Sequence, residues 1–424
     1  MNRLLPATLA VLALAAASCG GDDDDGGGEA LTSRGPITIW LSNNTEEKAW
    51  GEAAVEAWNA ENPDEEVTSQ EIPAGNTSEE VIGAAITAGN APCLIYNTAP
   101  AAVPQFQRQG GLVAINDFED ADAYVEERSG EAAEQYRSPD GNLYQMPWKA
   151  NPVMIFYNKA LFQQAGLDPE NPPLGTYDEF LTTAQTLVSS GVRAAIWPSP
   201  ESQFFQNWFD FYPLFIANTG QQLVEDGEAT FASDEGFAVA DFWRTLYDEG
   251  LAPREAFNGD AFNEGQSAMA IVGPWAIAVY DEVEWGAVPV PTSDGVAAEE
   301  IQTFSDEKSI GMYTACENQA TAWDFLKFTT SEEQDGALLE ATGQMPVRTD
   351  LVGTYPDYFA AHPDSVAFAE LTDRALDVPN VSNSVEVWQT LRDAWSEAVI
   401  FGEADPQQAL TAAAEEINSL VAED

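Results

Sequence analysis

The chain has 424 residues, of which 45% are hydrophobic and 11% aromatic. That length favours two folded units over one, and that hydrophobic content excludes a globally disordered chain. The net charge of −55, from 71 acidic and 16 basic residues, argues against nucleic acid, an anionic membrane surface or a strongly anionic ligand as a partner. A high-salt habitat and a lineage with ordinarily acidic exported proteins would both explain this acidity.

The first 18 residues are typical of a secretory signal peptide, with an apolar run too short to span a membrane. Ala16–Cys19 resembles a bacterial lipobox, so we expect Cys19 to be lipidated after cleavage; plain cleavage near Ala17 is the alternative. Residues 19–35 are rich in glycine and aspartate, which predicts a flexible, acidic tether. Two lipid chains would suffice for stable anchoring.

Strands and helices are predicted to alternate after the tether. Pro36–Leu41 is strand-like, and Asn44 with Glu47 can cap the helix that follows. A helix over Ser78–Ala88 then precedes an apolar strand at Cys93–Tyr96. This order predicts an α/β fold.

The segment Phe156–Leu181 predicts a strand, a short helix, a proline-rich link and a second helix. Thr176 and Glu179 have the spacing of a capping box, and the apolar residues after them recur at the helical period.

Four motifs in order carry a resemblance to a known family. They are FYNKALFQQAGLDPENPPLGTYDEFL at Phe156–Leu181, the segment Phe262–Ala270 with Gly273-Pro274-Trp275 after it, Ser309–Phe328, and GQMPVR at Gly343–Arg348. They closely resemble the extracellular solute-binding proteins of bacterial ABC importers, in the family that includes the maltose-binding protein. The resemblance covers roughly residues 36–424.

The resemblance implies an α/β, two-lobe periplasmic-binding-protein fold with three interlobe crossings and a central ligand cleft. It places lobe one at 36–148 plus 303–343 and lobe two at 152–300 plus 346–424. The crossings would fall near Pro147–Val153, Glu300–Ser305 and Gly343–Val347.

The implied function is the substrate-binding component of an ABC importer. It would capture a neutral mono- or oligosaccharide and deliver it by hinge closure to the transmembrane subunits of the permease. We expect a monomer outside the cytoplasm that meets the membrane through its lipid anchor only, without catalysis, cofactor, metal or nucleic acid. His362 is the only histidine, so a histidine-based triad or zinc site is not expected. A secreted glycosidase using paired carboxylates and a purely structural surface protein are the alternatives.

A sugar needs flat aromatic surfaces for its faces, and tryptophan supplies them. By resemblance, Trp275 of the Gly-Pro-Trp motif faces the cleft, and Trp388, Phe205 and Trp208 match aromatic residues near the sugar in the maltose-binding protein. Trp148 adjoins the first crossing. Core packing is the alternative for each of them.

Polar groups for the sugar's hydroxyls follow two predicted strands, because ligands lie beyond the carboxyl ends of strands in open α/β sheets. The alternative for each is turn formation or helix capping. The candidates are Ser42, Asn43, Asn44, Asn97 and Thr98.

Two further candidates lie at the crossings. Arg348 could donate a forked pair of hydrogen bonds to a ligand, or form an interlobe salt bridge instead. Ser305 lies at the second crossing.

With Cys19 lipidated, two cysteines remain, and an exported protein with two cysteines favours one disulfide. The resemblance places Cys93 and Cys316 on strands of lobe one, where they could be neighbours.

Overall fold

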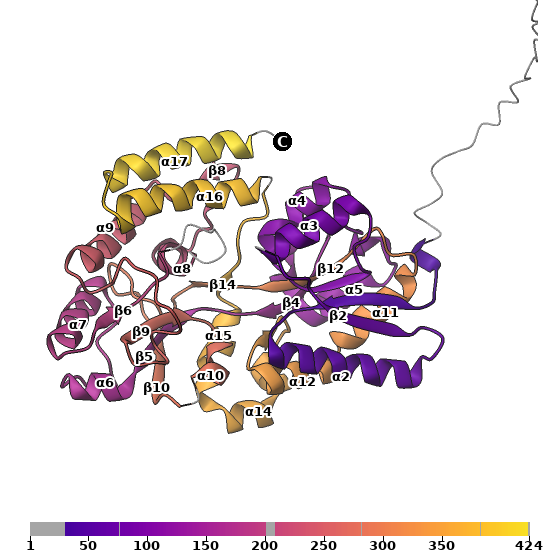
Figure 1. Cartoon of the computed structure of the whole chain (residues 1–424), viewed down its shortest axis with the longest axis horizontal. Coiled ribbons are helices and arrows are strands. Elements are labelled where there is room, and N and C mark those ends of the chain that lie inside the picture. The colour runs from indigo at the N-terminus through magenta and orange to yellow at the C-terminus, as the bar shows by residue number, and fades with distance from the viewer. Residues whose placement is uncertain (1–29, 76, 201–207, 281, 382, 423–424) are drawn as a thin grey trace, which may run out of the picture.

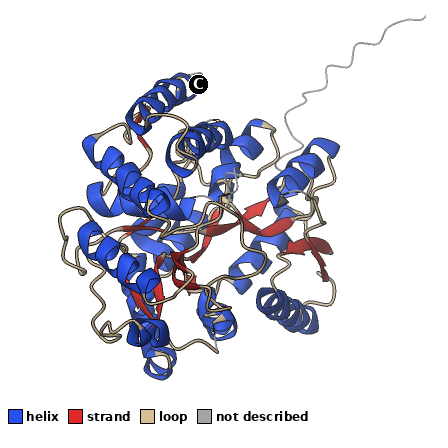
Figure 2. Cartoon of the chain, turned by 60° about the vertical axis from the view of Figure 1, so that its left-hand side comes forward, coloured by secondary structure: helices blue, strands red, loops and turns tan. Residues whose placement is uncertain are grey.

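The structure is a computed structural model that describes residues 30–422 except 76, 201–207, 281 and 382. It confirms the predicted α/β class: two lobes each surround a sheet of their own (Figure 1). Helices coloured blue in Figure 2 cover the strands of both sheets. In Figure 1 the orange helices α11 and α12 lie among the indigo and purple elements of the right-hand lobe, so the chain returns there late in the sequence.

Six strands form the sheet of lobe one, in the spatial order β13-β4-β12-β3-β1-β2. β1 is parallel to β2 and β3, whereas β12 is antiparallel to β3 and β4. The carboxyl ends of β1 and β3 therefore lie at one edge. The strands are β1 (Ile37–Leu41), β2 (Val67–Glu71), β3 (Leu94–Thr98), β4 (Met146–Ala150), β12 (Lys308–Met312) and β13 (Met345–Pro346). The helices are α2 (Thr45–Glu61), α3 (Ser78–Ala88), α4 (Val103–Arg108), α5 (Ala121–Ser129), α11 (Gln319–Thr329) and α12 (Glu332–Thr342), with 3-10 turns at Pro100–Ala102, Ile115–Asp117 and Gly130–Tyr136.

Lobe two has a four-stranded sheet in the order β10-β5-β9-β6, in which β6 is parallel to β9 and β5 is antiparallel to β9 and β10. Its strands are β5 (Met154–Asn158), β6 (Ala194–Ile196), β9 (Ser267–Val272) and β10 (Trp285–Val288), with a hairpin of β7 (Val224–Glu225) and β8 (Glu228–Ala229). Its helices are α6 (Lys159–Gln164), α7 (Tyr177–Ser189), α8 (Trp208–Thr219), α9 (Asp234–Asp248), α10 (Ala276–Val279), α16 (Ser384–Trp395), a π-helix at Ser396–Ile400, and α17 (Pro406–Val421). Three more, α13 (Leu351–Thr354), α14 (Pro356–Ala361) and α15 (Val366–Thr372), share a core cluster with β5 and with Leu339 of α12.

The chain passes between the sheets three times. It leaves β4 for β5 at residues 151–153, returns through β11 (Thr303–Phe304) to β12, and leaves again after β13. The first two crossings touch, because Val153 N donates to the carbonyl of Phe304 at 3.0 Å. β11 also pairs in parallel with β14 (Ala375–Leu376).

Local sequence signals set several of these boundaries. The Asn44 side chain accepts from the backbone N–H of Glu47 and begins α2. The capping box of Thr176 and Glu179 forms as predicted at the start of α7.

The predicted disulfide is confirmed. Cys93 precedes β3 and Cys316 follows β12, with Cα atoms 4.5 Å apart. These strands pair antiparallel, which brings the two cysteines to the same end of the sheet although 223 residues separate them along the chain.

Candidate functional site

A pocket of about 450 Å³ opens at the carboxyl ends of β1 and β3. Three predicted residues line it, namely Ser42, Asn43 and Asn97. Its other walls come from the loop after β2, the start of α3 and the segment before β12. Three of the polar candidates therefore share one pocket, and their contact with a ligand stays a prediction.

The backbone around the pocket is tightly constrained. Ser42 is only 4% exposed, donates its hydroxyl to Glu47 Oε2 at 2.6 Å and accepts from Asn44 N. Asn97 has a φ of 64°, in the left-handed region that asparagine adopts more readily than most residues other than glycine. Its role as a ligand contact stays a prediction.

Two predicted polar residues serve the fold instead. The Asn44 side chain is used in capping α2, and Asn44 is not among the residues that line the pocket. Thr98 is fully buried and donates its hydroxyl to the carbonyl of Ile95. The capping alternative is therefore right for Asn44, and the ligand prediction is wrong for Thr98 because its side chain points into the lobe.

Three charged residues in the lobe-one pocket were missed: Glu79, Asp306 and Lys308. Burial raises the pKa of the Glu79 carboxyl. Burial alone would lower the pKa of Lys308, but the nearby carboxylates, led by its ion-pair partner Asp306, raise it overall. The one available signal was position, since Asp306 and Lys308 directly follow the second crossing.

A second pocket, of about 390 Å³, lies along β9 and beyond the carboxyl end of β6 in lobe two. Aromatic rings of Trp197, Phe209, Phe257 and Tyr280 line it, together with polar groups that include Asp260. None of these residues was among the candidates; the Trp-Pro-Ser-Pro sequence at residues 197–200, directly after a short apolar run, was the signal that could have found them.

Trp275 lies at the end of the β9 segment, at the N-cap of α10, and is half-buried. Its ring packs 5.9 Å from that of Phe209, which also lines the lobe-two pocket. Trp275 thus borders that pocket without lining it. Its role as a ligand contact stays a prediction.

Trp148 and Trp388 are core residues. Trp148 is 1% exposed, and its ring centroid lies 5.6 Å from that of Trp50 and 5.3 Å from that of Tyr96. Trp388 is 2% exposed and packs edge-on against Tyr212 at 5.0 Å. The prediction that they face the cleft is wrong, because burying such large apolar rings stabilises the fold more than leaving them exposed.

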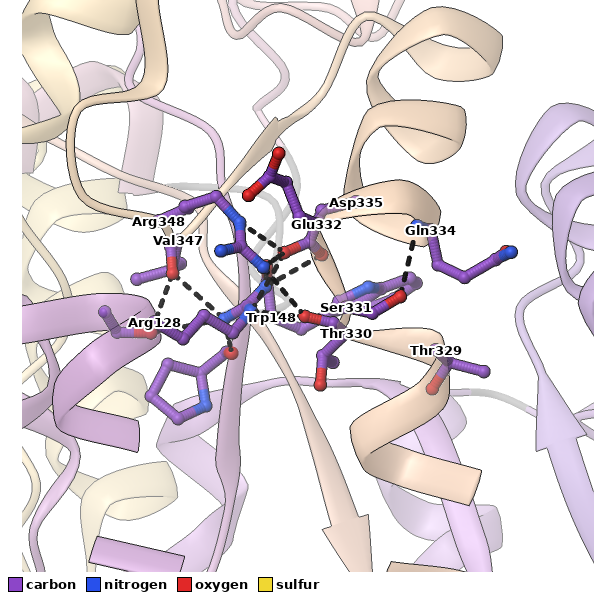
Figure 3. A network of polar contacts seen from close by, with 12 residues as sticks. Arg128, Trp148, Thr329, Thr330, Ser331, Glu332, Gln334, Asp335, Val347 and Arg348 are labelled. Atoms are coloured by element: carbon purple, nitrogen blue, oxygen red, sulfur yellow. Dashed lines mark hydrogen bonds and ion pairs between the residues drawn. The ribbon is translucent and has the colours of Figure 1, made fainter. Parts of the chain in front are cut away.

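The two residues at the crossings are engaged in the protein. Arg348 donates from Nε and Nη2 to Asp335 Oδ2 and from Nη2 to the carbonyl of Thr330 (Figure 3). Ser305 is fully buried, and its hydroxyl oxygen accepts from Asn151 N at 2.9 Å. The salt-bridge alternative is therefore right for Arg348, and Ser305 stabilises a crossing.

Three predicted residues cannot be placed. Phe205 and Cys19 lie outside the described residues. Trp208 is the first residue of α8, but the structure describes only its backbone.

Comparison with known families decides what class of protein carries these pockets. The family model of the bacterial extracellular solute-binding protein matches residues 53–365. The chain belongs to this family. Among curated solute-binding relatives, the maltodextrin-binding protein MdxE of Bacillus subtilis is 23% identical over 79% of this chain and 78% of its own length. The diacetylchitobiose binding protein DasA of Streptomyces coelicolor is 23% identical over 59% of this chain and 60% of its own length.

Solved structures share the two-lobe fold of this solute-binding protein. The GacH receptor of Streptomyces glaucescens, solved unliganded and with acarbose, has a TM-score of 0.78 at 23% identity, covering 92% of this chain and 99% of that one. UgpB of Mycobacterium tuberculosis, in complex with glycerophosphocholine, has a TM-score of 0.76 at 19% identity, covering 92% and 98%. The fold alone therefore does not fix the solute.

Proposed function

We propose that this extracellular solute-binding protein captures a neutral mono- or oligosaccharide between its lobes and delivers it to an ABC permease by hinge closure. The observation that carries the proposal is the combined chemistry of the two pockets. The lobe-one pocket presents hydroxyl, amide and charged groups, and the lobe-two pocket presents aromatic rings beside carboxylates such as that of Asp260. A sugar has hydroxyls at its edges and C–H patches on its faces, so it matches both kinds of surface.

The charge of the lobe-one pocket supports a neutral solute. Glu79 and Asp306 face a single ammonium, that of Lys308, which already pairs with Asp306. An anionic solute would meet uncompensated negative charge in addition to the net charge of the chain. The relatives also support a sugar, since they include a maltodextrin-binding protein and a diacetylchitobiose binding protein.

The rest of the proposal follows the expected organisation. A lipidated Cys19 and the tether would hold a monomeric, non-catalytic protein at the outer face of the membrane. The expected bounds are 36–148 plus 303–343 for lobe one and 152–300 plus 346–424 for lobe two, whereas the lobe-one sheet extends to Ala150 in β4 and to Pro346 in β13. Among the described residues, no helix has the length and apolarity that crossing a bilayer demands.

A thermal-shift panel tests the proposal. It contains maltotriose, diacetylchitobiose, a galacto-oligosaccharide, tagatose and acarbose, with the zwitterion glycerophosphocholine as the comparison that is not a sugar. A sugar at about 100 times its Kd would stabilise the fold by about 2.7 kcal/mol, which raises the melting temperature measurably. The carbohydrate assignment would be overturned if glycerophosphocholine alone stabilised the protein, or if none of the sugars did.

Two measurements separate the accompanying claims. Small-angle scattering should show a smaller radius of gyration with the stabilising sugar, because a ligand held by both lobes binds the closed state better. An unchanged scattering curve would remove hinge closure while leaving binding intact. Incubation with the same oligosaccharides should give no cleavage products; products would favour the glycosidase alternative.

A further inference from the structure

A chain of hydrogen bonds begins in the lobe-one pocket and reaches the crossings through a single carboxylate. Ser42, in the pocket lining, donates to Glu47 Oε2 at 2.6 Å. The other oxygen, Oε1, accepts from Gln344 Nε2 at 2.8 Å and from the ammonium of Lys149. Lys149 lies in β4 just before the first crossing, and Gln344 lies just before β13 at the third. Glu47 therefore ties the pocket loop to two crossings at once.

The hydrogen-bond network continues from Gln344 to the second crossing and back to the pocket. Gln344 Oε1 accepts from Asn151 Nδ2 at 3.3 Å, and the same nitrogen donates to the carbonyl of Asp306 at 2.9 Å. The backbone N–H of Asn151 donates to the hydroxyl of Ser305. Asp306 lines the same pocket as Ser42. Both ends of this hydrogen-bond network thus lie at the pocket, and its middle joins all three crossings.

Burial makes this network costly to break. Glu47 is 6% exposed, Gln344 4% and Asn151 2%. A buried polar group that loses its partner costs about 1–3 kcal/mol, and more if it is charged. Burial alone would raise the pKa of the Glu47 carboxyl, but the Lys149 charge and the donors from Lys149, Ser42 and Gln344 lower it overall. The carboxylate is therefore ionised at neutral pH, and its hydrogen bonds define a discrete arrangement rather than a loose one.

We propose that Glu47 and Gln344 are positioning residues that couple the occupancy of the lobe-one pocket to the geometry of the three crossings. A solute that hydrogen-bonds to Ser42 or to Asp306 acts on one end of a network whose other members hold the crossings. Only the identity of that solute rests on the proposed function; the coupling itself is a property of the chain. The competing interpretation is local, in which Glu47 merely neutralises the buried ammonium of Lys149.

Hydrogen exchange after a change at the pocket end tests the coupling without any ligand. Ser42→Ala removes one hydroxyl from the network. Ser309→Ala is the matched control, because Ser309 is also fully buried in lobe one, in β12, and its hydroxyl has no hydrogen-bond partner among the described residues.

We expect Ser42→Ala to speed exchange of the backbone N–H groups of Asn151 and Ser305 about tenfold, and Ser309→Ala to change them less than about twofold. Ser42 touches neither amide directly, so a local role predicts no difference between the two variants. Equal exchange at the crossings in both variants would overturn the proposal.

The middle link is tested by a double variant in the full chain. Gln344→Met should speed exchange of the same amides, and adding Ser42→Ala should produce no further increase if the path runs through Gln344. Effects that multiply instead would show that Ser42 reaches the crossings by another route, and would remove Gln344 from the positioning role.

Affinity provides the functional readout with any sugar that stabilises the wild-type chain in the panel above. Gln344→Met should weaken its binding about tenfold. The control is Gln319→Met, another buried glutamine of lobe one, whose Nε2 donates to the carbonyl of Cys316. It should lower the melting temperature comparably and leave affinity unchanged; an equal loss of affinity in both would contradict coupling. If no sugar stabilises the chain, the proposed function fails, while the exchange experiment still decides the coupling.

Discussion

Arg128 and Asp335 form a forked ion pair inside lobe one, with Arg128 Nε 2.9 Å from Asp335 Oδ2 and Nη2 3.0 Å from Oδ1 (Figure 3). Arg128 is 2% exposed and Asp335 is fully buried. The same guanidinium donates to the carbonyls of Pro147 and Trp148 before the first crossing, and to that of Val347 at the third. One buried arginine therefore fixes both segments to lobe one, and bending between the lobes must occur beyond them.

Removing this arginine should destabilise the fold strongly. Arg128→Met leaves the Asp335 carboxylate buried with Arg348 as its remaining cationic partner, and loss of one member of a buried ion pair typically costs about 3–5 kcal/mol. Lys159→Met is the control, because Lys159 pairs with the exposed Glu170 and such a pair contributes about 0–1 kcal/mol. Urea unfolding of the full chain measures both; similar losses would show that the buried pair is not special.

Two tryptophans provide opposite expectations. Trp275→Ala should weaken sugar binding by about 1.5–3 kcal/mol through lost stacking area, with a modest effect on the melting temperature. Trp148→Ala should lower the unfolding free energy by about 3–5 kcal/mol, since it opens a cavity between Trp50 and Tyr96. Calorimetric titration and thermal unfolding of both variants check this. Unchanged affinity with a large stability loss in Trp275→Ala would make it a second core residue.

The sequence alone could not tell which of these two tryptophans lies in the core, because each stands near the end of a strand segment beside a predicted cleft. What buries Trp148 is Trp50, on a helix far earlier in the chain, and no local pattern reveals that contact. Arg128 illustrates the same limit, since its partners at residues 335 and 347 are distant in sequence. The caps at Asn44 and Thr176 were predictable, because their partners lie three residues away. The positions of Ser42, directly after β1, and of Asn97, near the end of β3, were predictable from strand ends, although β3 runs to Thr98 and the predicted strand ended at Tyr96.

The Cys93–Cys316 disulfide should contribute about 2–4 kcal/mol, because it closes a long loop in the unfolded chain. A Cys93→Ala/Cys316→Ala double variant should therefore unfold at a lower urea concentration. Thiol labelling of the unfolded but unreduced wild-type chain should leave both cysteines unmodified. Their labelling under these conditions would mean that the bond does not form in the isolated protein.

Salt should stabilise this protein. The excess negative charges that give the net charge of −55 repel one another in the compact state. Salt screens this repulsion, because the Debye length falls from about 30 Å at 0.01 M to about 3 Å at 1 M ionic strength. The melting temperature should accordingly rise between dilute and molar NaCl. A flat or falling curve would show that self-repulsion does not limit stability.

Stability should also fall as the pH rises from about 5 to about 8, because of two buried acids beside the second crossing. Glu307, between β11 and β12, is 3% exposed, and Asp377, just after β14, is 4% exposed. Burial raises the pKa of Asp377 to about 8, and burial together with the charge of Asp377 raises that of Glu307. The charge of Lys308 acts to lower the pKa of both acids, and the charge of Asp306 acts to raise the pKa of Asp377 further.

The sign follows from proton binding. In the unfolded chain both acids have a pKa of about 4, so between about pH 5 and pH 8 the folded state binds more protons than the unfolded state. The unfolding free energy therefore decreases as the pH rises through this window, by up to about 1.4 kcal/mol for each unit of pKa difference. Asp377→Asn should flatten the dependence, whereas Glu131→Gln, which changes an exposed acid, should leave it intact. Thermal unfolding across this range measures both; a slope equally steep in Asp377→Asn and wild type would mean that general charge repulsion, and not this buried acid, sets the pH dependence.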